Sequence, residues 1–283
     1  MLDPRLLRAF VAIVDAGSFT AAAERLNMTQ STISQQLGRL EQAVNGELID
    51  RTARPVQATP AGERLLGYAR RILVLQAEAE TLLGDLAGTA AIRIGVPDDI
   101  VTPEMAEAFA HFSERHREVH LNVTTGLSRE MSRGFRTGEF DIAVIKEATA
   151  SADSRATFPE AMGWFESADK ARDWPDPIPL VAFPPGGLYR ETMFERIERE
   201  RRHWYIAFTG SSVTGVLAAV EAGLGLSLLP VGTTAGRRTR LHAGFGVEAA
   251  MTVSLYSWET DGPVGELVEM MTGVLADRYR SGR

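Results

Sequence analysis

Apolar side chains recur at helical spacing through the first 45 residues of the chain, which predicts a series of short helices. In the first of them Leu6, Phe10 and Ile13 share one face, because residues three or four apart lie on the same side of a helix. Gly17 is expected to end this helix, since glycine readily adopts the left-handed conformation that closes a helix. Ser18 follows directly and is a candidate N-cap for a second helix over residues 20–26.

The same spacing predicts a third helix, which Thr29 or Gln30 would open after a turn at residues 27–28. The apolar residues of its buried face are Ile33, Leu37, Leu40 and Val44. Residues 45–59 then combine turn-forming residues with short extended segments, a pattern typical of a two-stranded wing. The three helices and the wing together indicate one small, mainly helical domain.

A long amphipathic helix is predicted from Pro60 to about Gly88, with Thr59 as its N-cap. Apolar or small residues recur along it at alternating steps of four and three, with one polar interruption: Leu65, Ala69, Ile72, Gln76, Ala79, Leu83 and Leu86. Such a seam is typical of helices that pair as coiled coils, so we expect self-association through this helix. The alternative is a surface helix that packs on its own chain.

From Ala91 onward the pattern changes to alternating strands and helices. Strands are predicted at residues 92–96, 120–125 and 141–145, and helices at 102–117 and 128–136. Strands that alternate with helices in this way predict a parallel sheet with helices on its faces.

The alternation continues after a polar segment, residues 147–160, that we expect to be irregular. Further strands are predicted at 179–183, 204–208, 226–230 and 252–258, and further helices at 189–202, 212–222 and 264–279. Two α/β units of this kind predict a hinged pair of lobes, the first over about 91–146 with 259–283 and the second over about 160–258.

Composition is that of an ordinary soluble protein with room for two or three domains. The chain has 283 residues, of which 45% are hydrophobic and 24% charged. No apolar stretch reaches the roughly 18 residues that a membrane-spanning helix needs. Charged residues interrupt the first ten positions, where a secretory signal would be continuously apolar, so we expect a cytoplasmic protein and no membrane partner.

Several kinds of chemistry are excluded or disfavoured by residue types. The chain has no cysteine, which excludes disulfides, thiolate nucleophiles and cysteine–zinc sites. Its five histidines form no ligand pair at helical spacing, so neither a metal site nor a cofactor is expected. There is also no Gly-rich phosphate loop and no Gly-x-Ser-x-Gly motif, which argues against an enzyme.

Charge is unevenly distributed along the chain. The formal net charge is −7, which by itself argues against a nucleic-acid partner. Residues 1–76, however, contain nine arginines and seven acidic residues, so the excess of acid lies in the rest of the chain. A mildly basic N-terminal part attached to an acidic body suits a protein that binds DNA without coating it non-specifically.

The N-terminal residues also carry a resemblance to a known family. The matching positions are Phe10, Val14, Gly17-Ser-Phe-Thr, Ala22-Ala, Leu26, Thr29-Gln-Ser, Ile33-Ser, Leu40-Glu, Gly46, Leu48, Arg51 and Thr59-Pro-Ala-Gly. At these spacings the chain resembles the DNA-binding signature of LysR-type transcriptional regulators. Looser matches follow at Arg93-Ile-Gly-Val, Gly138-Glu-Phe-Asp-Ile-Ala and Ala219-Val-Glu-Ala-Gly-Leu-Gly.

The resemblance implies a fold, a function and a set of partners. The implied fold is an N-terminal winged helix-turn-helix over 1–59, a linker and dimerisation helix over 60–88, and a two-lobed α/β domain like a periplasmic binding protein over 89–283. The implied function is sequence-specific transcriptional regulation in response to a small-molecule effector. The implied partners are double-stranded DNA, a small-molecule co-inducer, RNA polymerase, and further copies in a homodimer or homotetramer.

Candidate DNA-binding residues lie on the outer face of the third helix and around it. A recognition helix needs polar side chains near its N-terminus, within reach of base edges. Those on this helix are Gln30, Ser31, Thr32, Ser34, Gln35 and Arg39. Thr20, Arg51 and Arg54 are better placed for phosphates, which position a protein on DNA without specifying sequence. The alternative is a solvated helix face that binds nothing.

Candidate effector-binding residues follow the predicted strands of the α/β part, where ligands of open α/β sheets bind. They are Asp98, Asp99, Thr102, Ser128, Lys146, Gly210, Ser211 and Ser212. Hydroxyl residues at three helix starts would favour an anion such as a carboxylate, while the two aspartates would favour a cation unless Lys146 balances their charge. An amino acid or a related amine-bearing acid carries both groups and would satisfy both demands. For each hydroxyl residue, simple helix capping without a ligand is the alternative.

Other functions stay open at this point. An effector-independent DNA-binding regulator would need the same N-terminal residues. A two-lobed solute-binding protein or an enzyme would not need the first 88 residues, and an enzyme would also need a convergent catalytic set that the sequence does not display.

Overall fold

The computed structural model describes residues 3–84, 90–170, 174 and 176–281. The chain divides into two compact units, residues 1–90 with 136–139 and residues 91–135 with 140–283. Each unit has hydrophobic cores of its own. Within the described ranges, no helix combines the length and the apolar character that crossing a membrane requires.

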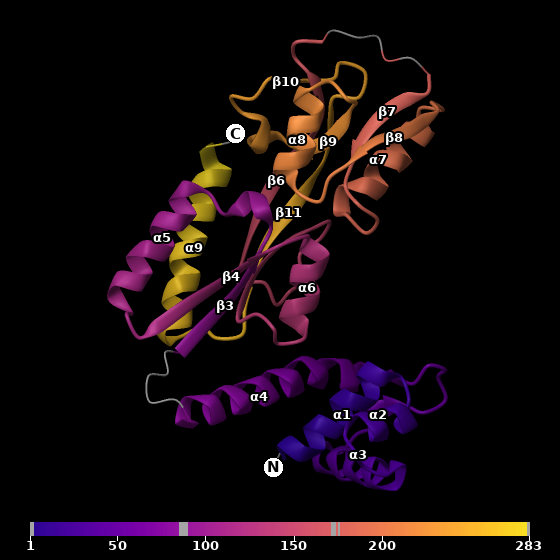
Figure 1. Cartoon of the computed structure of the whole chain (residues 1–283), viewed down its shortest axis with the longest axis vertical. Helices are drawn as coiled ribbons and strands as arrows, with labels where there is room; N and C mark the ends of the chain where they lie inside the picture. The colour runs from indigo at the N-terminus through magenta and orange to yellow at the C-terminus, as the bar shows by residue number, and fades with distance from the viewer. Residues whose placement is uncertain (1–2, 85–89, 171–173, 175, 282–283) are drawn as a thin grey trace. The chain divides into compact units, whose positions relative to one another are not determined.

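The N-terminal unit is a helical bundle with a short hairpin (Figure 1). Its elements are α1 (Pro4–Ala16), α2 (Phe19–Arg25), α3 (Gln30–Val44), β1 (Ile49–Asp50), β2 (Gln57–Ala58) and α4 (Pro60–Gly84). The apolar faces predicted for α1 and α3 lie in one core and are fully buried at Phe10, Ile13, Ile33, Leu37 and Leu40. Val44 was predicted to join them but is exposed, because it is the last residue of α3.

Capping residues begin and end these helices where the sequence predicted. Gly17 closes α1 with a φ of 60°, a left-handed conformation that suits glycine. The Ser18 hydroxyl accepts a hydrogen bond from the Ala21 N–H and opens α2. The Thr29 hydroxyl accepts one from the Thr32 N–H, at 3.2 Å, and opens α3. These three local predictions are confirmed.

The predicted wing is a two-stranded antiparallel hairpin, with Ile49 paired to Ala58. Glu41 ties α3 to this hairpin, because its Oε1 accepts a hydrogen bond from the Leu48 N–H at 3.0 Å. Gly62, in the first turn of α4, lies against the same strand. A Cβ on Gly62 would lie 2.1 Å from the Leu48 carbonyl oxygen, so this close approach of α4 requires glycine.

The long helix α4 begins at Pro60 as predicted, and residues 85–88 of the predicted helix lie outside the described residues. Ala69, a predicted seam residue, is fully buried in the core of its own unit, and Leu65 and Ile72 pack against that core. In this half of the helix the seam therefore packs on its own chain. Among the described side chains of α4, the large apolar ones that are exposed are Tyr68 and Leu75, at 61% and 43%. The Leu83 side chain and Leu86 lie outside the described residues.

The second unit contains the alternating strands and helices. Its first half consists of β3 (Ala90–Val96), η1 (Asp98–Ile100), α5 (Pro103–Arg115), β4 (Val119–Thr125), α6 (Ser128–Arg136), β5 (Ile142–Glu147) and β6 (Ala156–Ser167). Its second half consists of β7 (Ile178–Ala182), α7 (Leu188–Arg199), β8 (Trp204–Thr209), α8 (Val213–Glu221), β9 (Ser227–Pro230), η2 (Val231–Thr234), β10 (Thr239–Leu241), β11 (Val247–Ser257) and α9 (Gly262–Ser281).

The described strands of this unit form one large mixed sheet and one small sheet. The large sheet has the order β10-β6-β11-β5-β3-β4, with β9 paired to β6, and the small sheet pairs β7 with β8 in parallel. β3 and β5 are parallel neighbours, as the alternation of strands and helices predicted. Helices α5 and α9 lie side by side next to the part of the sheet that contains β3 (Figure 1).

Two long strands differ from the prediction. Residues 147–160 were expected to be irregular, but β6 begins at Ala156, and β11 begins at Val247, five residues before the strand predicted there. Pro159 and the polar residues Thr157 and Glu160 hid the start of β6 in the sequence. Proline is tolerated here because β6 pairs only with β11 at Pro159, and its pairing with β9 begins at Met162.

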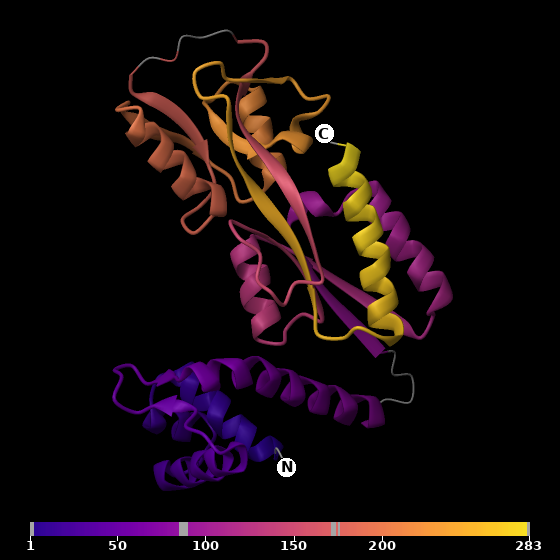
Figure 2. The same ribbon diagram turned by 180° about the vertical axis from the view of Figure 1, so that it is seen from behind.

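β6 and β11 connect two hydrophobic cores, and Figure 2 shows these strands side by side along the unit. Met162 and Trp164 of β6 and Met251 of β11 lie in the core formed with β7, α7 and α8. Val253 and Leu255, further along β11, lie in the core formed with β3, α5 and α9. The unit is therefore two-lobed, with a long antiparallel pair common to both lobes.

Candidate functional site

The outer face of α3 carries the predicted DNA-binding residues. Gln30, Ser31, Gln35 and Arg39 are exposed, and Thr32 and Ser34 are half-buried. Near the start of the helix the Thr29 hydroxyl lies 2.8 Å from both the Ser31 and the Thr32 hydroxyl oxygens. The helix thus presents a row of hydrogen-bonding side chains, backed by a fully buried apolar face.

The three residues predicted to contact phosphates are also exposed, but the two arginines already have partners within the protein. Thr20 is exposed on α2. An Arg51 Nη2 lies 3.0 Å from Glu41 Oε2, and the Arg51 guanidinium lies over the Phe19 ring. Arg54 Nη1 donates to the backbone oxygens of Arg51 and Ala53, both at 2.9 Å. These contacts hold the side chains near the hairpin, and their role on phosphate stays a prediction.

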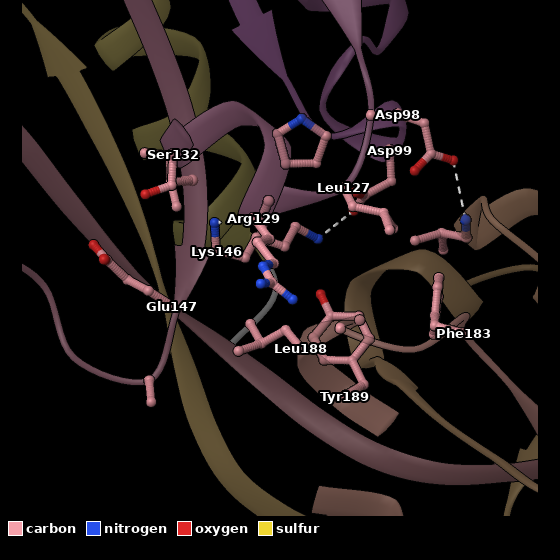
Figure 3. A pocket seen from close by; sticks show the side chains of 18 residues that line it. Asp98, Asp99, Leu127, Arg129, Ser132, Lys146, Glu147, Phe183, Leu188 and Tyr189 are labelled. Carbon is pink, nitrogen blue, oxygen red and sulfur yellow. Dashed lines mark hydrogen bonds and ion pairs between the residues drawn. The ribbon is translucent and has the colours of Figure 1, made fainter. Parts of the chain in front are cut away.

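A cavity of about 240 Å³ lies where β3 and β5 end in the second unit (Figure 3). Its lining comes from residues 97–99 after β3, the start of α6, the end of β5, the loop before α7 and the first residue of α8. Among the eight predicted effector residues, four line this cavity: Asp98, Asp99, Ser128 and Lys146. Sequence position after a strand therefore located half of the set.

The other four predicted residues lie outside that lining. The Thr102 hydroxyl accepts a hydrogen bond from the Met105 N–H and caps α5. The Ser212 hydroxyl accepts one from the Gly215 N–H, at 3.1 Å, and caps α8. Gly210 and Ser211 precede that cap. The capping alternative therefore describes Thr102 and Ser212 in this structure.

The N-terminus of α8 is not free for an anion, contrary to what the sequence predicted. The Val213 N–H, at the start of α8, donates to Asp98 Oδ2 at 3.0 Å. The protein's own carboxylate thus occupies the position that a bound anion would take. Burial raises the pKa of Asp98, and the neighbouring Asp99 carboxylate adds to this rise.

Lys146 is the centre of a buried ionic network beneath the cavity. Its Nζ lies 2.6 Å from Asp99 Oδ2 and 3.0 Å from Glu160 Oε1, and its side chain is 3% exposed. Burial alone would lower the pKa of Lys146, but the Glu160 and Asp99 carboxylates outweigh burial and raise this pKa well above its ordinary value. Lys146 therefore stays charged inside the protein.

Two tyrosines and an arginine complete the network. The Tyr279 hydroxyl donates to Glu160 Oε1 at 2.9 Å, and the Tyr189 hydroxyl approaches Glu160 Oε2 at 3.4 Å. Burial and the Glu160 carboxylate raise the pKa of both tyrosines, so both remain protonated donors. Arg278 donates to the Asp99 backbone oxygen at 2.6 Å and to its Oδ2 at 3.3 Å.

Sequence reasoning missed several residues of this site. Arg129, Ser132, Glu147 and Tyr189 line the cavity, and Glu160 lies behind it. Arg129 could have been found, since it follows Ser128 at a predicted helix start. The others gave no local signal, because the folding of distant segments brings them together.

Ser128 was predicted to bind the effector or to cap the start of a helix. In the structure its Oγ accepts a hydrogen bond from the Lys146 N–H at 3.0 Å. The hydroxyl thus fastens the start of α6 to the end of β5, and both segments line the cavity.

Comparison with known families covers most of the chain. Residues 4–63 match the family described as bacterial regulatory helix-turn-helix protein, lysR family. Residues 87–254 match the family described as LysR substrate binding domain. Among curated relatives, the transcriptional regulator DgdR of Burkholderia cepacia is 31% identical over 231 residues, which are 81% of this chain and 78% of DgdR. PecT of Dickeya dadantii is 30% identical, over 81% of this chain and 73% of PecT.

Solved structures show the same fold. Full-length LysG from Corynebacterium glutamicum, described with arginine bound as its effector, aligns with a TM-score of 0.60 at 22% identity and covers 98% of this chain and 99% of LysG. ArgP from Mycobacterium tuberculosis aligns with a TM-score of 0.57 at 25% identity, over 96% of this chain and 97% of ArgP. The matched region includes both the helical N-terminal unit and the two-lobed unit.

Proposed function

The chain belongs to the LysR family of bacterial DNA-binding transcriptional regulators, and from that premise we propose how its two units share the task. In this proposal residues 1–59 bind DNA, residues 60–88 form a linker and dimerisation helix, and residues 89–283 bind the effector. A regulator of transcription acts on the chromosome, so we place it in the cytoplasm with RNA polymerase as a further partner.

The proposed DNA-reading element is α3, inserted into the major groove. The observation that carries this proposal is the exposed polar row on α3, held in place by a fully buried apolar face. Gln30 and Gln35 can bond adenine edges, and Arg39 can bond guanine. Thr20, Arg51 and Arg54 would contact phosphates, and Arg51 would exchange Glu41 for a phosphate on binding.

Replacing Gln35 by alanine tests the reading element directly. We expect Gln35→Ala to weaken binding of the cognate operator by about 1–3 kcal/mol and to relax the preference at one base pair. Fluorescence anisotropy with wild-type and single-base-substituted operators measures both effects. Gln42→Ala is the matched control, because Gln42 is an exposed glutamine near the other end of α3. An unchanged base preference in Gln35→Ala would exclude Gln35 as a base-reading residue.

Self-association through α4 is proposed on a different face from the predicted seam. Tyr68 and Leu75 are seven residues apart on α4, and both are exposed apolar side chains. Residues at that spacing lie on one side of a helix and are typical of coiled-coil contacts. The proposed assembly is a homodimer, which can pair further into a homotetramer and reads an inverted-repeat site.

Sedimentation tests this assembly. Leu75→Asp would place a charge in the proposed interface, so we expect a smaller species and weaker operator binding than wild type. Val44→Asp is the control for mass, because it places the same charge on an exposed apolar residue of α3. If Leu75→Asp sediments like the control, α4 does not hold the copies together through this face.

The cavity of the second unit is the proposed effector site. It carries charged groups and lies at strand ends in the two-lobed unit. Its lining includes residues of α7 and α8 from one lobe and of η1, β5 and α6 from the other. A ligand bound there would contact both lobes and would favour one arrangement of them. Asp98, Asp99, Ser128 and Lys146 are the lining residues that the sequence already indicated. Thr102, Gly210, Ser211 and Ser212 are proposed to shape this site by capping or preceding helices rather than by contact.

A further inference from the structure

The charges around the cavity are balanced at most positions. Asp99 is paired with Lys146 and Arg278, and Lys146 is also paired with Glu160. Glu147 accepts a hydrogen bond from the Tyr256 hydroxyl at 2.6 Å. The ion pairs offset the charges of Asp99, Lys146 and Glu160, and the Tyr256 hydroxyl satisfies one oxygen of Glu147 without offsetting its charge.

Asp98 and Arg129 also lie outside the ion pairs, and their charges are opposite. Among the described residues, neither Asp98 nor Arg129 takes part in an ion pair, although both line the cavity (Figure 3). Asp98 is half-buried, and Arg129 is exposed at the start of α6. Asp98 is partly removed from water, so an opposite charge would stabilise it, whereas the exposed Arg129 guanidinium is free to pair with a carboxylate. The cavity therefore has one site for a cation and one for an anion.

The site at Asp98 is specific for a cation. The Asp98 carboxylate already accepts the Val213 N–H, the donor that α8 would otherwise offer to an anionic ligand. A carboxylate ligand placed here would meet Asp98 and Asp99 together and would be repelled by both. Burial and Asp99 raise the pKa of Asp98, and a bound cation would reverse that rise.

A second, independent observation at the same end of the cavity is an acceptor without a donor. Asp99 lines the cavity with a side chain only 6% exposed. Its Oδ1 has no hydrogen-bond partner within the described part of the chain, whereas Oδ2 accepts from Lys146 and Arg278. A buried acceptor without a donor costs free energy. An ammonium group carries three donors, and a guanidinium carries five.

The site at Arg129 suits a carboxylate. The Arg129 guanidinium lies beside Gly186, whose Cβ position is 2.8 Å from Nη1, and the φ of 84° at Gly186 is a left-handed conformation that favours glycine. Gly187 then opens α7 without a side-chain cap, and both glycines line the cavity. A guanidinium next to an uncapped helix start combines two groups that favour an anion.

The rest of the lining sets the size and character of the ligand. Leu127, Phe183, Leu188 and Val213 supply apolar surface, and the volume is about 240 Å³. Cavities that bind drug-sized ligands are commonly larger than this one. A short aliphatic ligand with charged ends therefore fits this cavity better than a large aromatic ligand.

We propose that the effector is a small molecule with a cationic amine or guanidinium group, which Asp98 binds, and a carboxylate, which Arg129 binds. This places the effector in the class of amino acids, and it rests on the proposed function, in which this cavity is the effector site. Asp98 would repel the second carboxylate of a dicarboxylate, and Arg129 would repel the second ammonium group of a diamine.

Calorimetry on the full-length chain tests the proposal with defined probes. One set is the common L-amino acids with ornithine. The other set has five carbons and varies only its ends: 5-aminopentanoate, pentane-1,5-diamine and glutarate. We expect at least one molecule that carries both an amine and a carboxylate to bind. We expect glutarate to bind at least 100-fold more weakly than that molecule.

Two variants separate the ends of the ligand. Asp98→Asn should lower the affinity for the amino acid that binds wild type at least tenfold, and Arg129→Gln should lower it by at least as much. Only Asp98→Asn should weaken any binding of the diamine. Arg133→Gln is the matched control, because Arg133 is exposed on the same helix outside the cavity lining, and its binding should equal that of wild type. Thermal unfolding of each variant checks that it is folded, and Arg129→Gln changes an exposed residue if Asp98→Asn proves unstable.

The inference and the proposed function fail in different ways. Binding of glutarate or of an uncharged molecule that Asp98→Asn leaves unchanged would overturn the amino-acid class and would leave the cavity as an effector site. Binding by none of the amine-bearing probes would also overturn the class. Operator binding, measured on the same preparation, tests the DNA-binding function independently of either result.

Discussion

The proposed DNA-reading face of α3 and the cavity of the second unit hold polar side chains in opposite ways. On α3, Gln30, Gln35 and Arg39 are exposed, and apolar side chains on the other face of the helix fix its position. Around the cavity, Lys146 and Glu160 are themselves buried, and charged or hydrogen-bonded partners fix them. In the first region the functional groups add nothing to the core, whereas in the second they are part of it.

The two regions therefore differ in which residues can be replaced without loss of stability. A side chain on α3 can be replaced without leaving a buried group unpaired, so DNA specificity can vary while stability is kept. Around Lys146 each replacement removes a partner from at least two other groups, and such effects are not additive. If the cavity binds the effector as proposed, we expect ligand specificity to change most readily at Asp98 and Arg129, which take part in none of these ion pairs.

The largest expected effect is the loss of stability in Lys146→Met. Methionine removes the charge that balances Asp99 and Glu160 and leaves both carboxylates buried. Removal of one partner from a buried ion pair costs about 3–5 kcal/mol in the free energy of unfolding. Chemical denaturation monitored by circular dichroism measures this loss.

Arg280→Met is the control for that variant. Arg280 is also paired with a carboxylate, Asp277, but both side chains are about three-quarters exposed, at 74% and 77%. Exposed ion pairs contribute little, so this change should stay within about 0.5 kcal/mol of wild type. Equal losses in the two variants would remove the distinction between the balanced network and a surface ion pair.

A smaller loss is expected at the start of α3. Thr29→Ala removes the hydroxyl that accepts the Thr32 N–H, and loss of such a cap costs about 1 kcal/mol. Denaturation measures this loss against Thr214→Ala, an exposed threonine inside α8 that caps no helix. If Thr29→Ala lost no more stability than Thr214→Ala, the buried face alone would hold α3 in place.

The smallest expected effect is a change in pH dependence at Asp98. Because burial and Asp99 raise its folded pKa, protonated Asp98 favours the folded state. This stabilisation is fully present below the ordinary pKa of an aspartic acid and is lost as pH rises through the raised value. Asp98→Asn removes the titration, so its stability relative to wild type should increase from pH 3 to pH 7.

Denaturation at a series of pH values tests this expectation. Asp153→Asn is the control, because Asp153 is exposed and lies outside the cavity lining. Its stability profile should run parallel to that of wild type. A parallel profile for Asp98→Asn as well would mean that Asp98 is solvated like Asp153, and the case for a cation site would lose its electrostatic support.

Local signals in the sequence predicted the N-terminal unit well. Gly17, Ser18 and Thr29 act within a few residues of their own position, so the chain near them contains all the information needed to place a helix end. The family signature covers the same residues. The self-association seam was less predictable, because periodicity does not distinguish a partner helix from the chain's own core, and Ala69 packs on the latter.

The cavity was predictable only in part. Asp98, Asp99, Ser128 and Lys146 follow or end strands and were found by position. Glu160 lies on a strand that its proline concealed, and Tyr279 donates to it across 119 residues of sequence. Contacts between such distant segments leave no periodicity and no motif. For the same reason the sequence did not predict the hydrogen bond from the Val213 N–H to Asp98, residues that are 115 positions apart. This bond occupies the N-terminus of α8 that an anion would otherwise bind.

The pairing of β5 with β11 has a consequence for the order in which the chain can fold during synthesis. The helices of the N-terminal unit emerge from the ribosome early and within a short time of one another. β5 has β3 on one side, but its neighbour on the other side is β11, in which Thr252 pairs with Glu147. At a synthesis rate of about 5–20 residues per second, β11 is synthesised roughly 5–20 s after β5. The helices that bind DNA can therefore be complete while the sensing lobe around β5 still lacks β11 and α9.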